Sequence, residues 1–184
     1  MTPLLTTERL RLRGFCPDDI APFAAYRSDP AVAKYQGWET PYSHEQAKEF
    51  VALMRKRTLG TAGQWYQIAI EHKADGQLLG DVAVHTLAED GKQAEIGFTL
   101  AREHQGQGVA REAVTAVFTH LFTQLEFHRL IAICDVENLP SQRLLERLGM
   151  RREAHYVENY WFKGAWHSEY LYAILHSEWE TAYV

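Results

Sequence analysis

Two glycines separated by one residue carry the first chemical signal in this sequence. Gly106 and Gly108 lie in the stretch EHQGQGVAREAV (residues 103–114), where a strand-like run ends and a helical pattern begins. A helix start offers unpaired backbone N–H groups and the positive end of the helix dipole. Glycines leave room for phosphate oxygens to reach those groups, which predicts a diphosphate site. The alternative is that the glycines only permit a tight turn.

Other kinds of catalytic or phosphate site do not fit the sequence. No Gly-Lys-Ser/Thr follows the glycines, and the third glycine of a dinucleotide fingerprint is missing. Cys134 lies in the apolar run LIAIC without a neighbouring histidine, which argues against a covalent thiol mechanism. The nine histidines show no HExxH or other ligand spacing, so no metal is expected.

A sheet and several helices must position the glycine loop. Alternating apolar residues predict a first strand, a central meander, a strand after the loop and a closing hairpin that turns at Lys163-Gly164. These strands are expected at residues 5–15, 65–72, 78–87, 94–100, 129–136 and 155–175. Helices are expected at residues 17–29, 43–57, 109–125 and 142–149, with a loop over 137–141. Ser43 and Gln46 have the spacing of a capping box.

This order of elements predicts an α/β fold, a mixed α+β arrangement, in a single domain over residues 1–184. A strand-helix-strand unit inside an antiparallel meander gives a mixed, mostly antiparallel sheet of about seven strands flanked by helices.

Composition excludes several classes of partner. The formal charge of −5 and the pI of about 6.0 argue against a nucleic-acid binder, so local donors must hold any anionic ligand. With two distant cysteines and no run of roughly 18 apolar residues, we expect a cytoplasmic protein with neither disulfides nor a membrane partner.

Three segments together resemble a known family. The loop QGQGVA matches the Q/R-x-x-G-x-G/A pattern of the GNAT N-acetyltransferase superfamily, with Gln105, Gly108 and Ala110 at its defining positions. HRLIAICDVENLPSQRLLERLGM resembles the strand, the Asn-x-x-Ser motif and the helix of the RimJ/RimL-like branch, which acetylates N-terminal amines of ribosomal proteins. TTERLRLRGF is similar to that branch's first strand. The resemblance covers nearly the whole chain and implies a GNAT fold with a central β-α-β unit that binds acetyl-CoA.

The resemblance assigns the coenzyme contacts. Main-chain groups of Phe98, Thr99 and Leu100 would hold the pantetheine arm. Asn138 and Ser141 would contact the pantetheine and thiol region. The diphosphate would rest on the loop and first helical turn, at Gln105, Gly106, Gln107, Gly108, Val109, Ala110 and Arg111. Arg111, Arg143 or Arg147 could meet the remaining phosphates, or each could be a solvated helix residue.

Acyl transfer from a thioester to an amine also requires proton transfers. Glu95 is the expected base, acting through water, because an alkylammonium with a pKa of ~10.4 must lose a proton first. The alternative for Glu95 is an exposed residue paired with a lysine. Neighbouring Gly97 is expected to mark a bulge, and an N–H near Leu100 to polarise the carbonyl. Leu145 stands where the superfamily often has a tyrosine, so Ser141 is the candidate to protonate the thiolate, or it is an N-cap.

The acceptor is expected between residues 33–43 and the closing hairpin. Tyr35, Trp38, Tyr160 and Trp161 could form flat apolar walls, and Glu39 and Glu158 could hold a cationic amine; Trp38, Glu158 and Tyr160 are the chosen candidates. A protein N-terminal amine is the first acceptor hypothesis. A small amine, namely a polyamine, an amino acid or an aminoglycoside, is the second, and a non-catalytic CoA-binding module is the third. A homodimer also stays open.

Overall fold

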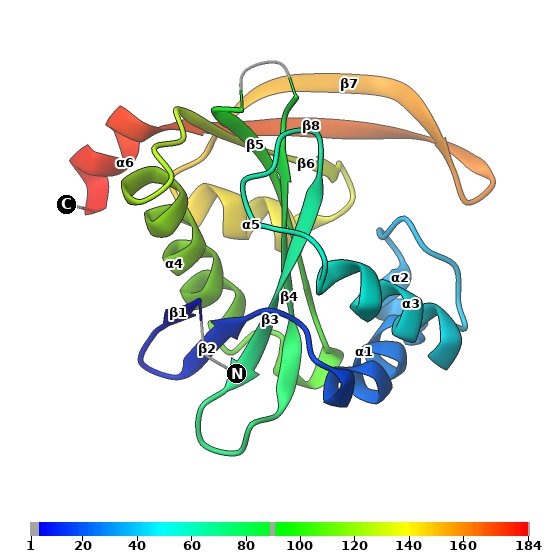
Figure 1. Cartoon of the computed structure of the whole chain (residues 1–184). Helices are drawn as coiled ribbons and strands as arrows, with labels where there is room; N and C mark the ends of the chain where they lie inside the picture. Colours follow the sequence, from blue (N-terminus) through cyan, green and yellow to red (C-terminus); the bar gives the residue numbers. More distant parts are fainter. Residues whose placement is uncertain (1–3, 89–90, 184) are drawn as a thin grey trace.

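The computed structural model describes residues 4–88 and 91–183, which form one sheet with helices on both faces (Figure 1). The sheet has eight strands in the order β1-β2-β3-β4-β5-β6-β8-β7. The strands are β1 (Leu5–Thr6), β2 (Leu10–Arg13), β3 (Trp65–His72), β4 (Leu78–Thr86), β5 (Gln93–Leu100), β6 (Arg129–Asp135), β7 (Arg151–Phe162) and β8 (Ala165–Leu175). The helices are α1 (Ile20–Arg27), α2 (Pro30–Ala33), α3 (His44–Met54), α4 (Val109–Thr123), α5 (Leu139–Arg147) and α6 (His176–Tyr183), with short 3-10 turns η1 (Pro17–Asp19) and η2 (Arg102–His104).

The predicted fold class is confirmed. Every described strand pair is antiparallel except β5 with β6, which are joined by the crossover helix α4. There are eight strands rather than about seven because residues 5–15 do not form one strand. The Thr7 amide donates to the Leu10 carbonyl at 3.0 Å and folds β1 back onto β2.

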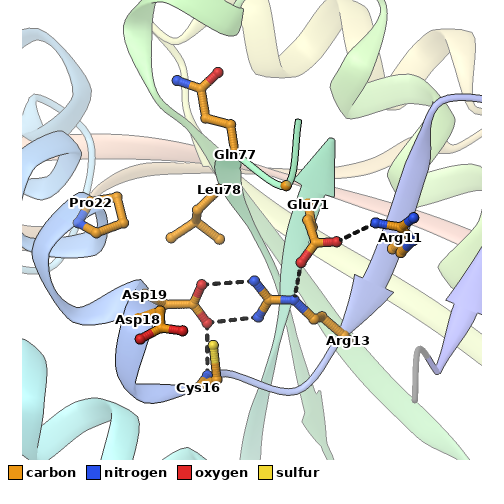
Figure 2. A pocket seen from close by; sticks show the side chains of 10 residues that line it. Arg11, Arg13, Cys16, Asp18, Asp19, Pro22, Glu71, Gln77 and Leu78 are labelled. Carbon is orange, nitrogen blue, oxygen red and sulfur yellow. Dashed lines mark hydrogen bonds and ion pairs between the residues drawn. The ribbon is translucent and has the colours of Figure 1, made fainter. Parts of the chain in front are cut away.

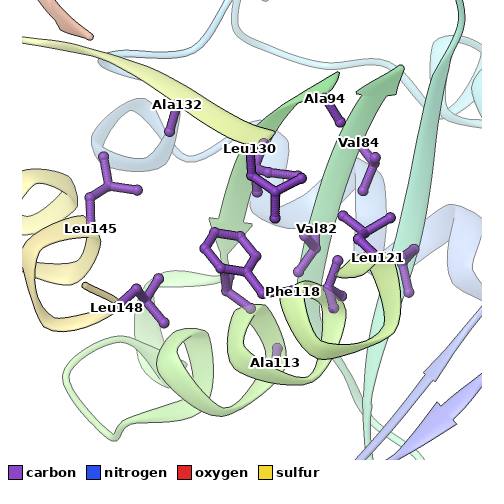
Figure 3. Close-up of a cluster of buried hydrophobic side chains, with 14 of the residues drawn as sticks. Val82, Val84, Ala94, Ala113, Phe118, Leu121, Leu130, Ala132, Leu145 and Leu148 are labelled. Atoms are coloured by element: carbon purple, nitrogen blue, oxygen red, sulfur yellow. The ribbon is translucent and has the colours of Figure 1, made fainter. Parts of the chain in front are cut away.

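Two apolar cores cover the two faces of the sheet. Helices α4, α5 and α6 pack on one face, where Val82, Phe118 and Leu130 belong to the larger cluster (Figure 3). Helices α1, α2 and α3 pack on the other face around Phe23. Because each fully buried side chain of this size contributes about 1.5–3 kcal/mol, these clusters hold the strands in register. None of the helices in the described part of the chain is long and apolar enough to cross a membrane.

Local sequence signals explain where most helices begin. Ser43 caps α3, and its hydroxyl accepts from the Gln46 amide while the Gln46 side chain accepts from the Ser43 amide, which confirms the capping box. The predicted loop over residues 137–141 is wrong. Helix α5 already begins at Leu139, and Asn138 is its N-cap because its side-chain oxygen accepts from the Ser141 amide at 3.3 Å. Ser141 is therefore not the N-cap.

Two further expectations need correction. Gly97 pairs with Ala83 without any register shift, so it marks no bulge. The register shift in the meander lies instead between β3 and β4, at Ile70 and Glu71 and beside Gly80. A Cβ on Gly80 would stand 2.1 Å from the Thr99 carbonyl oxygen. Helix α6 was not predicted; its Trp179 is buried against Phe118 and Phe122.

Candidate active site

The two central parallel strands separate soon after they meet. Strand β6 pairs with β5 only at Gln93, Ala94 and Glu95, although β5 continues to Leu100. We call the divergence beyond Glu95 the seam. Two hydrogen bonds show which residues of this segment turn their main-chain groups towards β4. The Leu87 amide donates to the Gln93 carbonyl, and the Ala101 amide donates to the Leu79 carbonyl, so Gln93 and Ala101 both face β4. Alternation then directs the main-chain groups of Phe98 and Leu100 towards the seam and those of Thr99 towards β4.

The glycine loop lies at the end of the seam. Gly106 and Gly108 have φ angles of 73° and 78°, which glycine adopts without strain. A Cβ on Gly106 would meet nothing within 4 Å, so backbone conformation rather than crowding requires these glycines. Gln105 fixes the loop to the strand, since its side-chain amide donates to the Leu100 carbonyl at 3.1 Å. Within the described chain, the amides of Gly106, Gln107 and Gly108 have no hydrogen-bond partner.

A contact absent from the sequence prediction fastens this loop to the N-terminal hairpin. Arg9 donates from Nε to Glu112 Oε2 at 2.6 Å and from Nη1 to the Gln107 carbonyl at 3.1 Å. Glu112 Oε1 accepts from the Thr7 hydroxyl at 2.6 Å and from the Arg9 amide at 2.9 Å. Glu112 lies in the first turn of α4, so it ties the helix start to the β1–β2 turn. No local signal could reveal this contact, because 103 residues separate its partners.

The residues expected around the coenzyme lie on two helix starts. Val109, Ala110 and Arg111 form the first turn of α4, and its leading amides are free of helical partners. Asn138 uses its side-chain oxygen for capping, while the half-buried Ser141 hydroxyl makes no hydrogen bond to any described residue. The arginines proposed for phosphate contacts, Arg111, Arg143 and Arg147, are exposed. Leu145 is buried in the core, so it leaves no polar group in the position of the tyrosine.

Glu95 stands on the last paired position before the seam. It lies opposite His85 on β4 and Ile131 on β6, and its side chain is half-buried. Burial raises the pKa of the Glu95 carboxyl above its usual value; nearby His85 opposes the shift and Glu169 adds to it. A carboxylate with a raised pKa is a better proton acceptor, which suits a general base. The alternative pairing of Glu95 with a lysine is not observed among the described residues.

A second group of polar residues lies at the end of β6. The Asp135 carboxylate is buried and its Oδ2 lies 2.6 Å from His167 Nδ1 and 3.2 Å from the Tyr160 hydroxyl, which donates to it. Its Oδ1 accepts from the Glu137 amide at 2.7 Å. Burial and the neighbouring Asp135 carboxylate raise the pKa of Tyr160, so this hydroxyl stays a donor. Sequence reasoning selected Tyr160 but missed Asp135 and His167.

The acceptor candidates do not all face one space. Trp38 donates from Nε1 to the Arg27 carbonyl at 2.9 Å, and its ring centre lies 3.9 Å from the buried Arg27 guanidinium carbon. It is therefore part of a packed aromatic group rather than a free wall. Tyr35 donates to the Glu137 carbonyl at 3.2 Å, which places it near the end of β6.

The tip of the β7–β8 hairpin joins the same region. Lys163 donates to the Ala33 carbonyl at 2.7 Å, so the hairpin closes against α2. Glu158 has a φ of 46° and stands where the β7–β8 register shifts, with its carboxylate exposed. Glu39 is exposed, and Trp161 is 62% exposed in an edge-to-face pair with Trp166. These three side chains therefore make no closed pocket.

Two other chemical features do not form a reaction site. Burial raises the pKa of Cys134 to about 12, so its thiol stays protonated and unreactive. A cavity of about 530 Å³ is lined by charged groups that already pair with each other (Figure 2). In it, Arg13 donates to both carboxylate oxygens of Asp19 at 2.7 and 2.8 Å, and to Glu71 at 2.6 Å.

Comparison with known proteins decides the family. A model described as an acetyltransferase (GNAT) domain matches residues 9–151. The chain belongs to the GNAT acetyltransferase family. The uncharacterized N-acetyltransferase YnaD of Bacillus subtilis is 32% identical over 175 residues, which cover 95% of this chain and 98% of YnaD. A GNAT-family acetyltransferase structure from Bacillus anthracis has a TM-score of 0.84 at 29% identity and covers 94% of this chain and 98% of that one.

Two further similar acetyltransferases differ in the acceptor that their descriptions name. A Vibrio cholerae structure described as a putative ribosomal-protein-serine acetyltransferase has a TM-score of 0.77 at 26% identity, over 95% of this chain and 99% of that chain. A spermidine N(1)-acetyltransferase of Vibrio cholerae is 28% identical over 141 residues, covering 77% of this chain and 79% of the relative. The first agrees with the resemblance to the RimJ/RimL-like branch. The protein is thus a GNAT N-acetyltransferase whose acceptor these relatives do not determine.

Proposed function

We propose that this protein moves an acetyl group from acetyl-CoA to a primary amine, and that its first candidate acceptor is a protein N-terminal amine. The observation that carries the proposal is the seam, where the free edge of β5 leads from Glu95 to the open amides of the glycine loop. An extended ligand that adds to a strand edge and ends in a diphosphate matches both features. The third hypothesis, a non-catalytic CoA-binding module, does not explain why a half-buried carboxylate, Glu95, lies beside the seam.

The residues present suit the coenzyme. Phe98 and Leu100 supply main-chain groups for the pantetheine arm, and residues 106–111 supply amides for the diphosphate without needing net positive charge on the protein. Thr99 would contribute packing alone, because its main-chain groups face β4. Acetyl-CoA supplies the thioester, and the amides of Phe98 and Leu100, which face the seam, are the donors available to polarise its carbonyl.

The amine reacts only after it loses a proton. Glu95 accepts that proton through water, after which the amine nitrogen bonds to the carbonyl carbon and the carbon–sulfur bond breaks. Ser141, with its hydroxyl unengaged in the described structure, supplies a proton to the departing sulfur.

Replacing Glu95 tests this assignment. We expect Glu95→Gln to lower kcat about 100-fold near neutral pH and to raise the pH optimum, because only amine already deprotonated in solution can then react. Coenzyme affinity in calorimetry stays near the wild-type value. Glu153→Gln, on β7, is the control with the same change of charge. Wild-type turnover in Glu95→Gln would remove this carboxylate from the mechanism.

The acceptor class has its own test. A polyamine is the second candidate, because Glu169 is close enough to influence Glu95 electrostatically and lies opposite Asp135, so carboxylates are grouped on this face. Thiol release should be measured with a peptide carrying a free N-terminal serine and with spermidine. Faster release with the peptide supports the first candidate, and faster release with spermidine replaces it with the second.

A further inference from the structure

The Asp135–His167 pair has the form of a base held by a carboxylate. We propose that His167, oriented by Asp135, is a second proton acceptor for the amine that the enzyme acetylates. This inference rests on the proposed function, and it adds a catalytic residue and a positioning residue to that function.

Hydrogen bonding sets the orientation of the imidazole. Asp135 is buried, with 2% of its side chain exposed, whereas the His167 side chain is 25% exposed. The short contact of 2.6 Å joins Nδ1 to the carboxylate, which can only accept, so Nδ1 is the donor; in the neutral ring Nε2 then holds the lone pair. No described residue forms a hydrogen bond to Nε2. The pair therefore presents a basic nitrogen that is fixed at one end and accessible to solvent.

The pair lies on the same face of the sheet as Glu95. Glu95 is opposite Ile131, and Asp135 lies further along the same face of β6, since alternate residues share a face. Glu169 lies opposite Asp135 on β8, and its charge raises the pKa of Glu95. Glu95 on β5 and the Asp135–His167 pair on β6 and β8 therefore stand on the two sides of the seam, and Glu169 on the side of the pair influences Glu95 electrostatically.

A purely structural role for the pair is a weaker explanation. Tyr160 already donates to the same Asp135 oxygen, and Lys163 fastens the hairpin to α2. The hairpin therefore has two other attachments, and neither needs a titratable ring with a free nitrogen.

The reaction gives two proton acceptors separate tasks. A primary ammonium that becomes an amide loses two protons, one before attack and one after the nitrogen–carbon bond forms. One proton ends on the sulfur of the released coenzyme thiol, and the other goes to solvent. Glu95 accepts the first proton through water, and that proton replaces the one that Ser141 gives to the sulfur. His167 accepts the second proton after the nitrogen–carbon bond forms and passes it to water through its exposed edge. The carbon–sulfur bond breaks as before, so atoms and charge balance.

Several ionisable groups face His167. Asp135 comes from β6, Tyr160 from β7 and Glu169 from β8. Lys34 and Tyr35, which follow α2, reach the Glu137 carbonyl through a chain of hydrogen bonds. Lys163, at the tip of the hairpin, lies over the Phe162 ring, which in turn contacts His167 edge-to-face.

Two substitutions at His167 separate basicity from structure. Asparagine in His167→Asn can still donate an amide hydrogen to Asp135 but offers no basic nitrogen. We expect this variant to lose about 100-fold in kcat/KM at neutral pH and to lose the limb of the pH profile that belongs to the imidazole. In His167→Ala, added imidazole should restore part of the rate. Asp135→Asn should cause a similar loss that does not add to the loss from His167→Asn.

The matched control is a second histidine–aspartate pair outside the site. His72 Nδ1 lies 3.0 Å from Asp75 Oδ1 at the β3–β4 turn, and His72→Asn should leave the rate unchanged. Rates are measured with spermidine and with the N-terminal serine peptide, and coenzyme binding by calorimetry. A wild-type pH profile in His167→Asn, or no rescue by imidazole, would overturn the role of His167 while the proposed function stands. If the wild-type enzyme acetylates neither probe, both proposals fail.

Discussion

Glu95 illustrates how neighbours two strands away tune a single carboxylate. Burial raises its pKa, His85 on β4 counteracts this, and Glu169 on β8 reinforces it. A general base acts only when it is deprotonated, so a higher pKa moves the acidic limb of the rate profile to higher pH.

Removing the charge of Glu169 should reverse its contribution. We expect Glu169→Gln to lower the pKa of Glu95 and to shift the acidic limb of kcat/KM to lower pH, because one negative neighbour is lost. The glutamine oxygen can still accept from Asn159, which now donates at 2.6 Å. His85→Gln should shift the limb in the opposite direction. Identical pH profiles for all three proteins would show that Glu95 does not govern the limb.

The burial of side chains was predictable where it follows the alternating period of a strand. Alternation in AEIGFTL separates Glu95 from Ile96 and Leu100, and the structure confirms that those two apolar side chains are buried. Contacts such as Asp135 with His167 join residues 32 positions apart, so they depend on strand register that the sequence does not reveal. The start of α5 did have a signal, because Pro140 favours the first turn of a helix.

At the scale of elements, the start of α4 is held by three attachments. Gln105 ties the loop to β5, while Arg9 and Thr7 tie α4 to the N-terminal hairpin through Glu112. The loop therefore keeps its amides open without a ligand. Preorganisation of this kind lowers the entropic cost of binding an anion.

Two glycines with nearly equal φ angles allow the loop to be tested. Gly108 has a φ of 78° and Gly76, in the β3–β4 turn, has a φ of 76° with nothing within 4 Å of an added Cβ. Alanine at either position costs about 1–2 kcal/mol of backbone strain. We expect both variants to lose similar stability, and only Gly108→Ala to weaken coenzyme binding at least about tenfold in calorimetry. Equal coenzyme affinity in the two variants would favour the tight-turn explanation.

Hairpins and long helices were the elements that sequence patterns located best. Strand β3 and the turn at Lys163-Gly164 fall where predicted, because turn residues and apolar period agree there. Helix α2 was missed because it has four residues, too few to show a helical period, and α6 was missed because it follows β8 directly without a turn signal.

At the scale of the molecule, a buried ion network connects the N-terminal segment to the sheet. Arg13 on β2 pairs with Asp19 in η1 and with Glu71 on β3 (Figure 2). The side chains of Arg13 and Asp19 are 8% and 3% exposed, so neither charge can turn to water if its partner is lost. The hydrogen bond to Asp19 raises the pKa of Arg13, which keeps it charged.

Breaking this network should destabilise the whole fold. We expect Asp19→Asn to lower the free energy of unfolding by about 3 kcal/mol in urea, because the variant removes one of the two carboxylates that pair with a buried guanidinium. Glu45→Gln removes an exposed carboxylate that pairs with Lys48 at 3.3 Å, and it should cost less than about 1 kcal/mol. Equal losses would mean that solvent reaches the network.

The short stretch of pairing between β5 and β6 has a thermodynamic consequence for the protein without coenzyme. In the described part of the sheet, strand pairing joins β5 to β6 at only three positions, so much of the main-chain hydrogen-bonding capacity at the middle of the sheet goes unused. A ligand that fills this gap completes the hydrogen-bond ladder and, because it binds only the folded protein, stabilises the fold. Amide deuterium uptake at Phe98 and Leu100 should therefore be rapid in the free enzyme. It should become slow once coenzyme is bound, because the ligand then accepts hydrogen bonds from these amides as an added strand would.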